Sequence, residues 1–154
     1  MSYWLLKSEP ETFGIADLRQ SPSRTTCWDG VRNFQARNFL RDRVRKGDLA
    51  FFYHSNCAQP GIVGIVRIAR SGYPDHTAFD PRDAHFDPKS NPAAPTWYMV
   101  DVALERELRR IITLEELKRR ASKELEGFAL LKRGNRLSVM PVADAHWNFI
   151  LSLE

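Results

Sequence analysis

The stretch that decides the fold of this chain spans residues 47–66 and reads Gly-Asp-Leu-Ala-Phe-Phe-Tyr-His-Ser-Asn-Cys-Ala-Gln-Pro-Gly-Ile-Val-Gly-Ile-Val. It holds two short apolar runs, Leu49–Tyr53 and Ile62–Val66, each rich in aromatic or β-branched residues and bounded by glycine or proline. Neither run is long enough for a useful helix, so both are predicted to be buried strands. Between them lies a polar segment, residues 54–57, which we call the polar arc.

The polar arc admits two interpretations. Its four hydrogen-bonding side chains, His54-Ser55-Asn56-Cys57, fit a hydrated hairpin loop with Asx-type turn chemistry. They equally fit the rim of a pocket, with donors and acceptors aimed at a ligand. Gly64 favours the pocket, because a glycine inside a strand costs stability and often marks the close approach of a ligand or another backbone segment.

Composition indicates one globular domain over residues 1–154. The mass is 17.8 kDa, and 43% of the residues are hydrophobic and 27% charged, which is ordinary for a soluble domain. The net charge is +4, and the basic excess is mostly arginine. Arginine binds phosphate through its planar fork and stacks on bases, so a nucleic-acid partner fits, although so mild an excess is weak evidence alone.

Several classes of function are not indicated. Cys27 and Cys57 show neither a metal-ligand spacing nor a disulfide scaffold. The first apolar run, Tyr3–Leu6, is too short for a signal peptide or a membrane span. We therefore expect no metal, no cofactor and no membrane partner, and a cytoplasmic location.

Outside the central hairpin, the sequence predicts short strands and short helices in mixed order. Strands are expected at Tyr3–Leu6, at residues 97–104 and at Leu137–Val142, the last at a sheet edge because Pro141 cannot donate to a ladder. Helices are expected at Thr12–Gln20, at residues 34–44 with Asn33 as N-cap, after the Thr113–Glu116 capping box and after Asp144. No βαβ rhythm appears, so we predict an α+β fold: a small barrel of mixed, mostly antiparallel strands with short peripheral helices.

Residues 71–96 hold five prolines, which predicts a long loop that is either functional or disordered. Histidines and aspartates between residues 75 and 87 invite a metal site, but no pair has a recognised ligand spacing and aspartate is common in turns. Trp97 follows directly. Strand alternation turns it away from the main apolar series, so that it either fills a second core layer or lines a cleft.

Several blocks of the sequence carry a resemblance to one family. They are Tyr3–Pro10, Trp28–Asn33 with Ala36-Arg37-Asn38, Gly47–Cys57, Pro60–Gly64, Asp87–Ser90, Trp97–Val102, and Arg136–Val139 with Pro141-Val142. In this order they resemble the EVE domain proteins and are similar to the thymocyte nuclear protein family. The resemblance covers almost the whole chain. It implies a PUA-like pseudo-barrel, related to the YTH and ASCH domains, with a pocket for a modified base: 5-methyl- or 5-hydroxymethylcytosine in DNA is favoured, and RNA is the other polymer to consider.

Such a pocket must replace the stacking and pairing that a base loses when it leaves its helix. The candidates for stacking are Trp28, Tyr53 and Trp97, although core filling would also explain Trp28. The candidates for contacting the base edge are Ser8, Asn33, Ser55 and Asn56, with His54 shaping the pocket. The candidates for the flanking phosphates are Lys7, Arg32, Arg37 and Lys89, and the resemblance places Arg37 nearest the pocket.

The predicted helix at 34–44 also has a basic face. Arg37, Arg41 and Arg45 recur every four residues beside its apolar side. We expect this face to contact the nucleic-acid backbone, with Arg41 as its representative residue.

The main alternative is an enzyme that acts on a modified or acylated nucleoside in the same pocket. His54 with Cys57 or Ser55 would then be base and nucleophile, or Lys7 with Glu9 an acid–base pair. The sequence shows neither a group that orients the base nor an oxyanion site, so we predict a non-catalytic module in which Cys57 is a small buried apolar group. A third alternative is a protein-interaction module without a ligand of its own. It is the least favoured, because it assigns the polar arc no role beyond being part of the surface.

Overall fold

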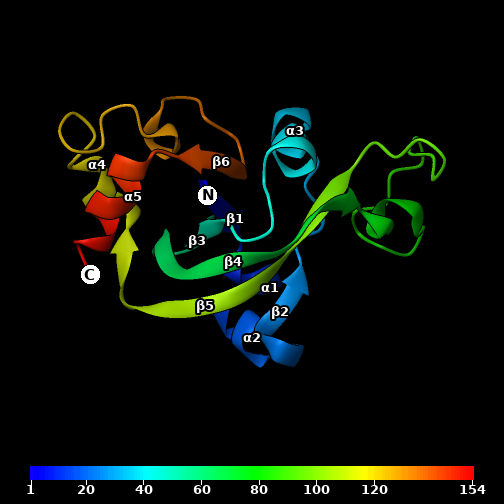
Figure 1. The fold of residues 1–154 in the computed structure, drawn as a ribbon, viewed down its shortest axis with the longest axis horizontal. Helices are drawn as coiled ribbons and strands as arrows, with labels where there is room; N and C mark the ends of the chain where they lie inside the picture. The colour runs from blue at the N-terminus through cyan, green and yellow to red at the C-terminus, as the bar shows by residue number, and fades with distance from the viewer.

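The computed structural model describes all 154 residues and shows a six-stranded sheet with short helices around it (Figure 1). The strands are β1 (Tyr3–Ser8), β2 (Thr25–Cys27), β3 (Leu49–His54), β4 (Gly61–Pro74), β5 (Tyr98–Thr113) and β6 (Val139–Val142). The helices are α1 (Pro10–Phe13), α2 (Ile15–Gln20), α3 (Phe34–Asp42), α4 (Leu114–Lys118) and α5 (Asp144–Leu151), with 3-10 turns η1 (Pro22–Arg24), η2 (His76–Phe79) and η3 (Ala129–Leu131). None of the helices has the length and apolar character needed to cross a membrane.

The strand order is β2-β5-β4-β3-β1-β6. β1 runs parallel to β3, with Leu5 opposite Phe51, and every other neighbouring pair is antiparallel. The long strands β4 and β5 run together along the molecule, and the segment that joins them lies at the opposite end from α5 (Figure 1). The predicted α+β class, with mixed, mostly antiparallel strands and peripheral helices, is confirmed.

The sheet is buried on both faces, which explains why residues 49–53 form a continuous apolar run instead of alternating with polar residues. Phe52 points to one core cluster, which also contains residues of α2 and α3. Phe51 and Tyr53 point to a second cluster on the other face, with residues of α4 and α5. Successive side chains of a strand point to opposite faces, so apolar side chains at every position are needed to fill both clusters.

Two strands are longer than predicted. β5 continues nine residues past residue 104, to Thr113, which pairs with Gly61 of β4. Exposed polar side chains predominate in this half of the strand, so the sequence there lacks the alternation of apolar and polar residues that predicts a strand. β4 continues to Pro74, so residues 71–74 belong to a strand and not to the predicted loop.

Three helix predictions need correction. The predicted helix at 12–20 is two short helices, α1 and α2, separated by Gly14, whose backbone is extended. α3 ends at Asp42 and not at residue 44. Asp144 is the first residue of α5 and not its cap, because the N-cap residue is Ala143 and no side chain caps this helix.

The predicted caps and edge strand are otherwise confirmed. Asn33 Oδ1 accepts the Ala36 N–H of α3 at 3.0 Å, and Thr113 Oγ1 accepts the Glu116 N–H of α4 at 3.1 Å. The Glu116 carboxylate binds Arg110 instead of returning to the cap, so the capping box is only half formed. β6 is the outermost strand next to β1, but it begins at Val139 and not at Leu137 as predicted.

Gly64 does mark a close approach, but the approaching group is a side chain of α2. A Cβ at Gly64 would lie 2.3 Å from Ile15 Cδ1 and 3.1 Å from the Arg106 carbonyl oxygen. The glycine therefore lets α2 pack directly on β4, and its presence is explained without a ligand.

Candidate functional site

A cavity of about 690 Å³ opens at one end of the parallel strand pair β1 and β3. Its lining comes from the end of β1 with α1 (7–9, 12 and 13), from β2 and the loop that leads to α3 (26–33), from Ser55 and His85, and from the segment before β6 (136–138). The volume falls within the range of about 300–1,000 Å³ that is usual for small-molecule sites.

Backbone pairing brings these distant segments together. β1 and β3 are parallel, so their carboxyl ends meet, and the Ser55 N–H donates to the Ser8 carbonyl at 3.0 Å. The Lys7 N–H donates to the Ser138 carbonyl at 2.9 Å, which adds the segment before β6. The Trp28 N–H donates to the Val100 carbonyl at 2.7 Å, which fixes the loop after β2 on β5.

The cavity gathers only part of the predicted site. Of the predicted residues it contains Lys7, Ser8, Trp28, Arg32, Asn33 and Ser55. The structure places the others outside its lining, namely Arg37, Arg41, Tyr53, His54, Asn56, Lys89 and Trp97. Sequence reasoning missed Asp29, His85 and Arg136 as lining residues. Asp29 and Arg136 lie in blocks that carry the family resemblance, so a signal for them was present, whereas His85 stood out only among the histidines and aspartates of a possible metal site.

Trp28 is both a core residue and a cavity wall. Its side chain packs edge-on against Phe52, with ring centroids 5.3 Å apart and planes at 88°, and the residue is only 7% exposed. The core-filling interpretation of Trp28 therefore applies, since the residue belongs to the core cluster around Phe52. Its indole N–H makes no hydrogen bond within the protein, and its remaining surface lines the cavity.

Trp97 does not form a second wall. Its Nε1 donates to Asp87 Oδ2 at 2.7 Å, and its ring stacks on Phe34 with a centroid distance of 4.9 Å. The bond from Trp97, together with the Lys89 N–H, lowers the pKa of Asp87. Tyr53 is likewise removed from the cavity, because strand alternation directs its ring into the core cluster on the other face, where burial raises its pKa to about 12.

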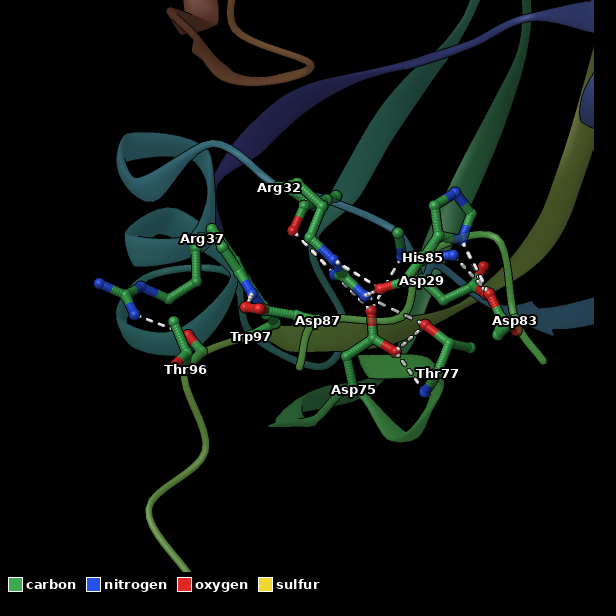
Figure 2. Close-up of polar contacts among 12 residues, drawn as sticks. Asp29, Arg32, Arg37, Asp75, Thr77, Asp83, His85, Asp87, Thr96 and Trp97 are labelled. Carbon is green, nitrogen blue, oxygen red and sulfur yellow. Dashed lines mark hydrogen bonds and ion pairs between the residues drawn. The ribbon is translucent and has the colours of Figure 1, made fainter. Parts of the chain in front are cut away.

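Arg32 fastens the segment between β4 and β5 to the cavity wall (Figure 2). Its guanidinium donates to Asp75 Oδ2 at 3.0 Å, to Thr77 Oγ1 at 3.2 Å and to the His85 carbonyl at 2.8 Å. Asp75 is fully buried, and it also accepts the Gly30 N–H at 2.9 Å. Burial by itself raises the pKa of Asp75, but the bonds from Thr77, Gly30 and Arg32 outweigh it and the net shift is downward.

Gly30 is required by the same arrangement. Its φ is +79°, in the left-handed region that favours glycine, and a Cβ would lie 2.5 Å from His85 Cε1. The His85 ring therefore rests against the Asp29-Gly30 turn, with Nδ1 3.4 Å from Asp83 Oδ1 and 4.0 Å from Asp29 Oδ2. The Asp-Gly pair thus serves both the turn and the packing of the 75–97 segment.

The polar arc mainly fastens the end of β3 to α1 and α2. His54 Nε2 accepts the Ile15 N–H at 3.2 Å, and Asn56 Nδ2 donates to Glu9 Oε1 at 2.8 Å. Only Ser55 of the arc lines the cavity. Cys57 is half-buried, not fully buried as expected, and lies outside the cavity lining. With its Nε2 lone pair already occupied, His54 does not have that nitrogen free to act as a general base.

This role of His54 predicts a pH dependence. Burial lowers its pKa, so protonation is less favourable in the folded state. The stabilisation from neutral His54 is present above the unfolded-state pKa of about 6.5 and is lost as pH falls through the lower folded-state value. We expect His54→Gln, which keeps an acceptor for Ile15, to flatten the decline of unfolding free energy measured by urea titration between pH 7.5 and 5. His146→Gln is the matched control; an equal flattening there would contradict the prediction.

Three ionisable groups of the cavity have shifted pKa values. Burial lowers the pKa of Lys7. Burial, followed by the charges of Asp29 and Asp101, raises the pKa of Cys27. Burial is also the main cause that raises the pKa of Asp29. Such clustering of perturbed groups in one cavity is typical of functional sites.

The arginines of the predicted basic face are engaged by the protein. Arg37 donates to the Thr96 carbonyl at 2.6 Å (Figure 2). Arg41 forms a two-point pair with Asp42, with both nitrogen–oxygen distances at 2.8 Å. Arg45 donates to the Asp42 carbonyl at 2.7 Å. Arg41 and Arg45 remain exposed, so a contact with a polymer backbone stays a prediction for them.

Comparisons with known proteins agree with this architecture. The EVE domain model matches residues 2–153. Thymocyte nuclear protein 1 of Rattus norvegicus is 49% identical over 168 residues, an alignment that covers 99% of this chain and 74% of that protein. The crystal structure of the human THYN1 protein in complex with 5-methylcytosine-containing DNA is 46% identical, with a TM-score of 0.95 over 99% of this chain and 97% of that one. A crystal structure from Pseudomonas putida is 47% identical, with a TM-score of 0.92 over 99% of both chains. The fold is thus the PUA-like fold of these proteins, and the chain belongs to the EVE domain family.

Proposed function

We propose that this chain is a non-catalytic nucleic-acid-binding module whose cavity captures a modified cytosine, with 5-methyl- or 5-hydroxymethylcytosine in DNA as the favoured ligand. The similarity in sequence and structure to the human THYN1 protein, which was crystallised with 5-methylcytosine-containing DNA, supports this proposal. A base leaves its helix only if the protein compensates for lost stacking and pairing. The cavity has the chemistry for both.

The position of Trp28 is the observation that carries the proposal. Its indole packs edge-on against Phe52 and is part of the cavity lining. A base stacked on an aromatic ring gains about 1–3 kcal/mol. Polar side chains of the same cavity, including Asn33 and Ser55, are available for the base edge.

We assign the flanking phosphates to Lys7 and Arg136. Both line the cavity, and neither forms an ion pair with a carboxylate of the protein. Arg32 has a different role in this proposal, because its donors are engaged by Asp75, Thr77 and His85. It shapes the wall against which the base lies.

The enzyme alternative has weaker support. The pairs proposed within the polar arc do not meet in the cavity, since His54 and Cys57 lie outside its lining. Lys7 and Glu9 do line it, so an acid–base role for them is the version of the alternative to test. Hydrolysis of an acylated cytidine by the wild-type protein, abolished in Glu9→Gln, would favour the enzyme.

The proposed function is tested by binding to short single strands that differ at one central base. We expect DNA with 5-methylcytosine or 5-hydroxymethylcytosine to bind more tightly than DNA with unmodified cytosine, and RNA versions of the same strands to bind more weakly. Fluorescence anisotropy at one fixed salt concentration measures all of them, because affinity for nucleic acid depends on salt. Equal affinity for modified and unmodified cytosine would refute the proposal.

Arg41 tests whether the face of α3 contacts the backbone. Arg41→Ala is expected to weaken binding of modified and unmodified strands equally and to reduce the slope of log affinity against log salt by about 0.7–1. Arg119→Ala is the matched control. Arg119 is also exposed, and it forms an ion pair with Glu115 of α4. An unchanged slope would remove Arg41 from the interface.

A further inference from the structure

A pocket that accepts 5-methylcytosine faces a difficulty, because thymine carries the same methyl group at C5. The two bases differ on the hydrogen-bonding edge, where cytosine has an amino group at C4 that donates and an unprotonated N3 that accepts. Thymine has an O4 that accepts and an N3–H that donates. Contacts with the methyl group therefore cannot separate these bases, and polar groups of fixed direction must do so.

Asn33 lines the cavity, and a helix cap fixes the orientation of its amide. Its Oδ1 accepts the Ala36 N–H at 3.0 Å as the N-cap of α3. An asparagine amide carries its acceptor on one atom and its donors on the other, so the capping bond leaves Nδ2 for other partners. Nδ2 has no partner within the protein, and Asn33 lines the cavity. Rotation of the amide would break the cap.

Asp29 carries a carboxylate to which no side chain of the protein donates a hydrogen bond. Asp29 lines the cavity, its carboxylate accepts a hydrogen bond from its own backbone N–H but none from a side chain, and His85 Nδ1 lies 4.0 Å from its Oδ2. The other carboxylate of the lining, Glu9, accepts a hydrogen bond from Asn56. Burial raises the pKa of Asp29, as expected for a carboxylate with few compensating bonds. An amino group of a ligand would supply the missing donor.

We propose that Asp29 and Asn33 together determine the specificity of the cavity for cytosine bases over thymine. This proposal rests on the function proposed above. Asn33 Nδ2 donates to the acceptors N3 or O2 of the base, and Asp29 accepts from its C4 amino group. Thymine would place O4 against the Asp29 carboxylate and its N3–H against the Asn33 amide. Both contacts are repulsive, and the same methyl group on the ring does not compensate for them.

The test compares single strands of DNA that carry cytosine, 5-methylcytosine or thymine at one position. The wild-type protein is expected to prefer 5-methylcytosine to thymine by about ten- to hundred-fold, as for one good pair of base-edge hydrogen bonds. Asp29→Asn keeps the size of the side chain but can turn an amide donor towards O4, so the ratio should fall to near one. Glu107→Gln, which removes one negative charge away from the cavity, controls for a general gain in affinity and should keep the ratio.

A second variant covers the case in which Asp29→Asn does not fold. Asn33→Ser retains an N-cap residue but lacks the amide donor, and it should also lower the ratio. If the wild type binds 5-methylcytosine no better than cytosine, the proposed function fails. If it prefers 5-methylcytosine to cytosine but binds thymine equally well, or if the folded variants keep the wild-type ratio, the function stands and the role of Asp29 and Asn33 is wrong.

Discussion

Trp28→Ala is expected to reduce both the affinity for a 5-methylcytosine strand and the stability of the protein. Loss of the stacking surface should weaken binding by about 1–3 kcal/mol, or roughly 5- to 150-fold. Because Trp28 is 7% exposed and packs on Phe52, the deletion also leaves a void in the core. Large aromatic deletions of this kind cost about 3–5 kcal/mol. The burial of this ring therefore predicts a clear drop in the unfolding midpoint.

Trp28→Phe separates the two effects. Phenylalanine keeps an apolar ring against Phe52, so most of the stability should return, while the smaller face should still weaken binding. Trp147→Phe is the matched control, because Trp147 is 3% exposed and stacks between Tyr3 and Phe51 on the other side of the sheet. It should lower stability and leave affinity unchanged. Urea unfolding measures the stability of each variant, and fluorescence anisotropy measures its affinity. If Trp28→Phe and Trp28→Ala both fold and both bind with wild-type affinity, Trp28 is not part of the binding surface.

Arg32→Met is expected to destabilise the protein by about 3–5 kcal/mol, the usual consequence of removing one partner from a buried ion pair. The change leaves the fully buried Asp75 carboxylate without its guanidinium. In the wild type, the stabilisation from Asp75 is present above its unfolded-state pKa of about 3.9 and is lost as pH falls through its lower folded-state pKa. In Arg32→Met the folded-state pKa of Asp75 should rise towards the unfolded-state value, so less stability should be lost through this carboxylate on acidification, and the loss reverses if the folded-state pKa rises above that value.

Arg82→Met is the control for this substitution. Arg82 pairs with Asp80 at 3.7 Å, but its side chain is 94% exposed, and exposed pairs contribute little to stability. Urea titrations of both variants and of the wild type between about pH 7 and 3 provide the comparison, because the Asp75 contribution changes below its unfolded-state pKa of about 3.9. Equal stability of the two variants would show that the Arg32–Asp75 pair does not hold the cavity wall. Affinity for a 5-methylcytosine strand should also fall in Arg32→Met, because the Asp75 carboxylate accepts the N–H of Gly30, which belongs to that wall.

The sequence by itself determined the features that depend on neighbouring residues. The apolar runs at Leu49–Tyr53 and Ile62–Val66 form strands, Asn33 caps α3, and β6 lies at the sheet edge. Each follows from short-range rules: side-chain alternation, the orphan N–H groups of a first helical turn, and the missing donor of Pro141. The ordered set of motif blocks also identified the family, which the comparisons confirm.

Only the tertiary structure decided which side chains remain free to meet a ligand. His54 is adjacent to Ser55 in sequence, yet the Ile15 N–H occupies its ring nitrogen and Ser55 alone faces the cavity. Arg32 is of a residue type that commonly binds phosphate, but its guanidinium donates to Asp75, 43 residues further along the chain. A hydrogen-bonding group binds whichever partner folding brings within about 3 Å, and that partner comes from any part of the chain. Local patterns therefore predict the strands and caps, whereas the free donors and acceptors of the cavity depend on long-range packing.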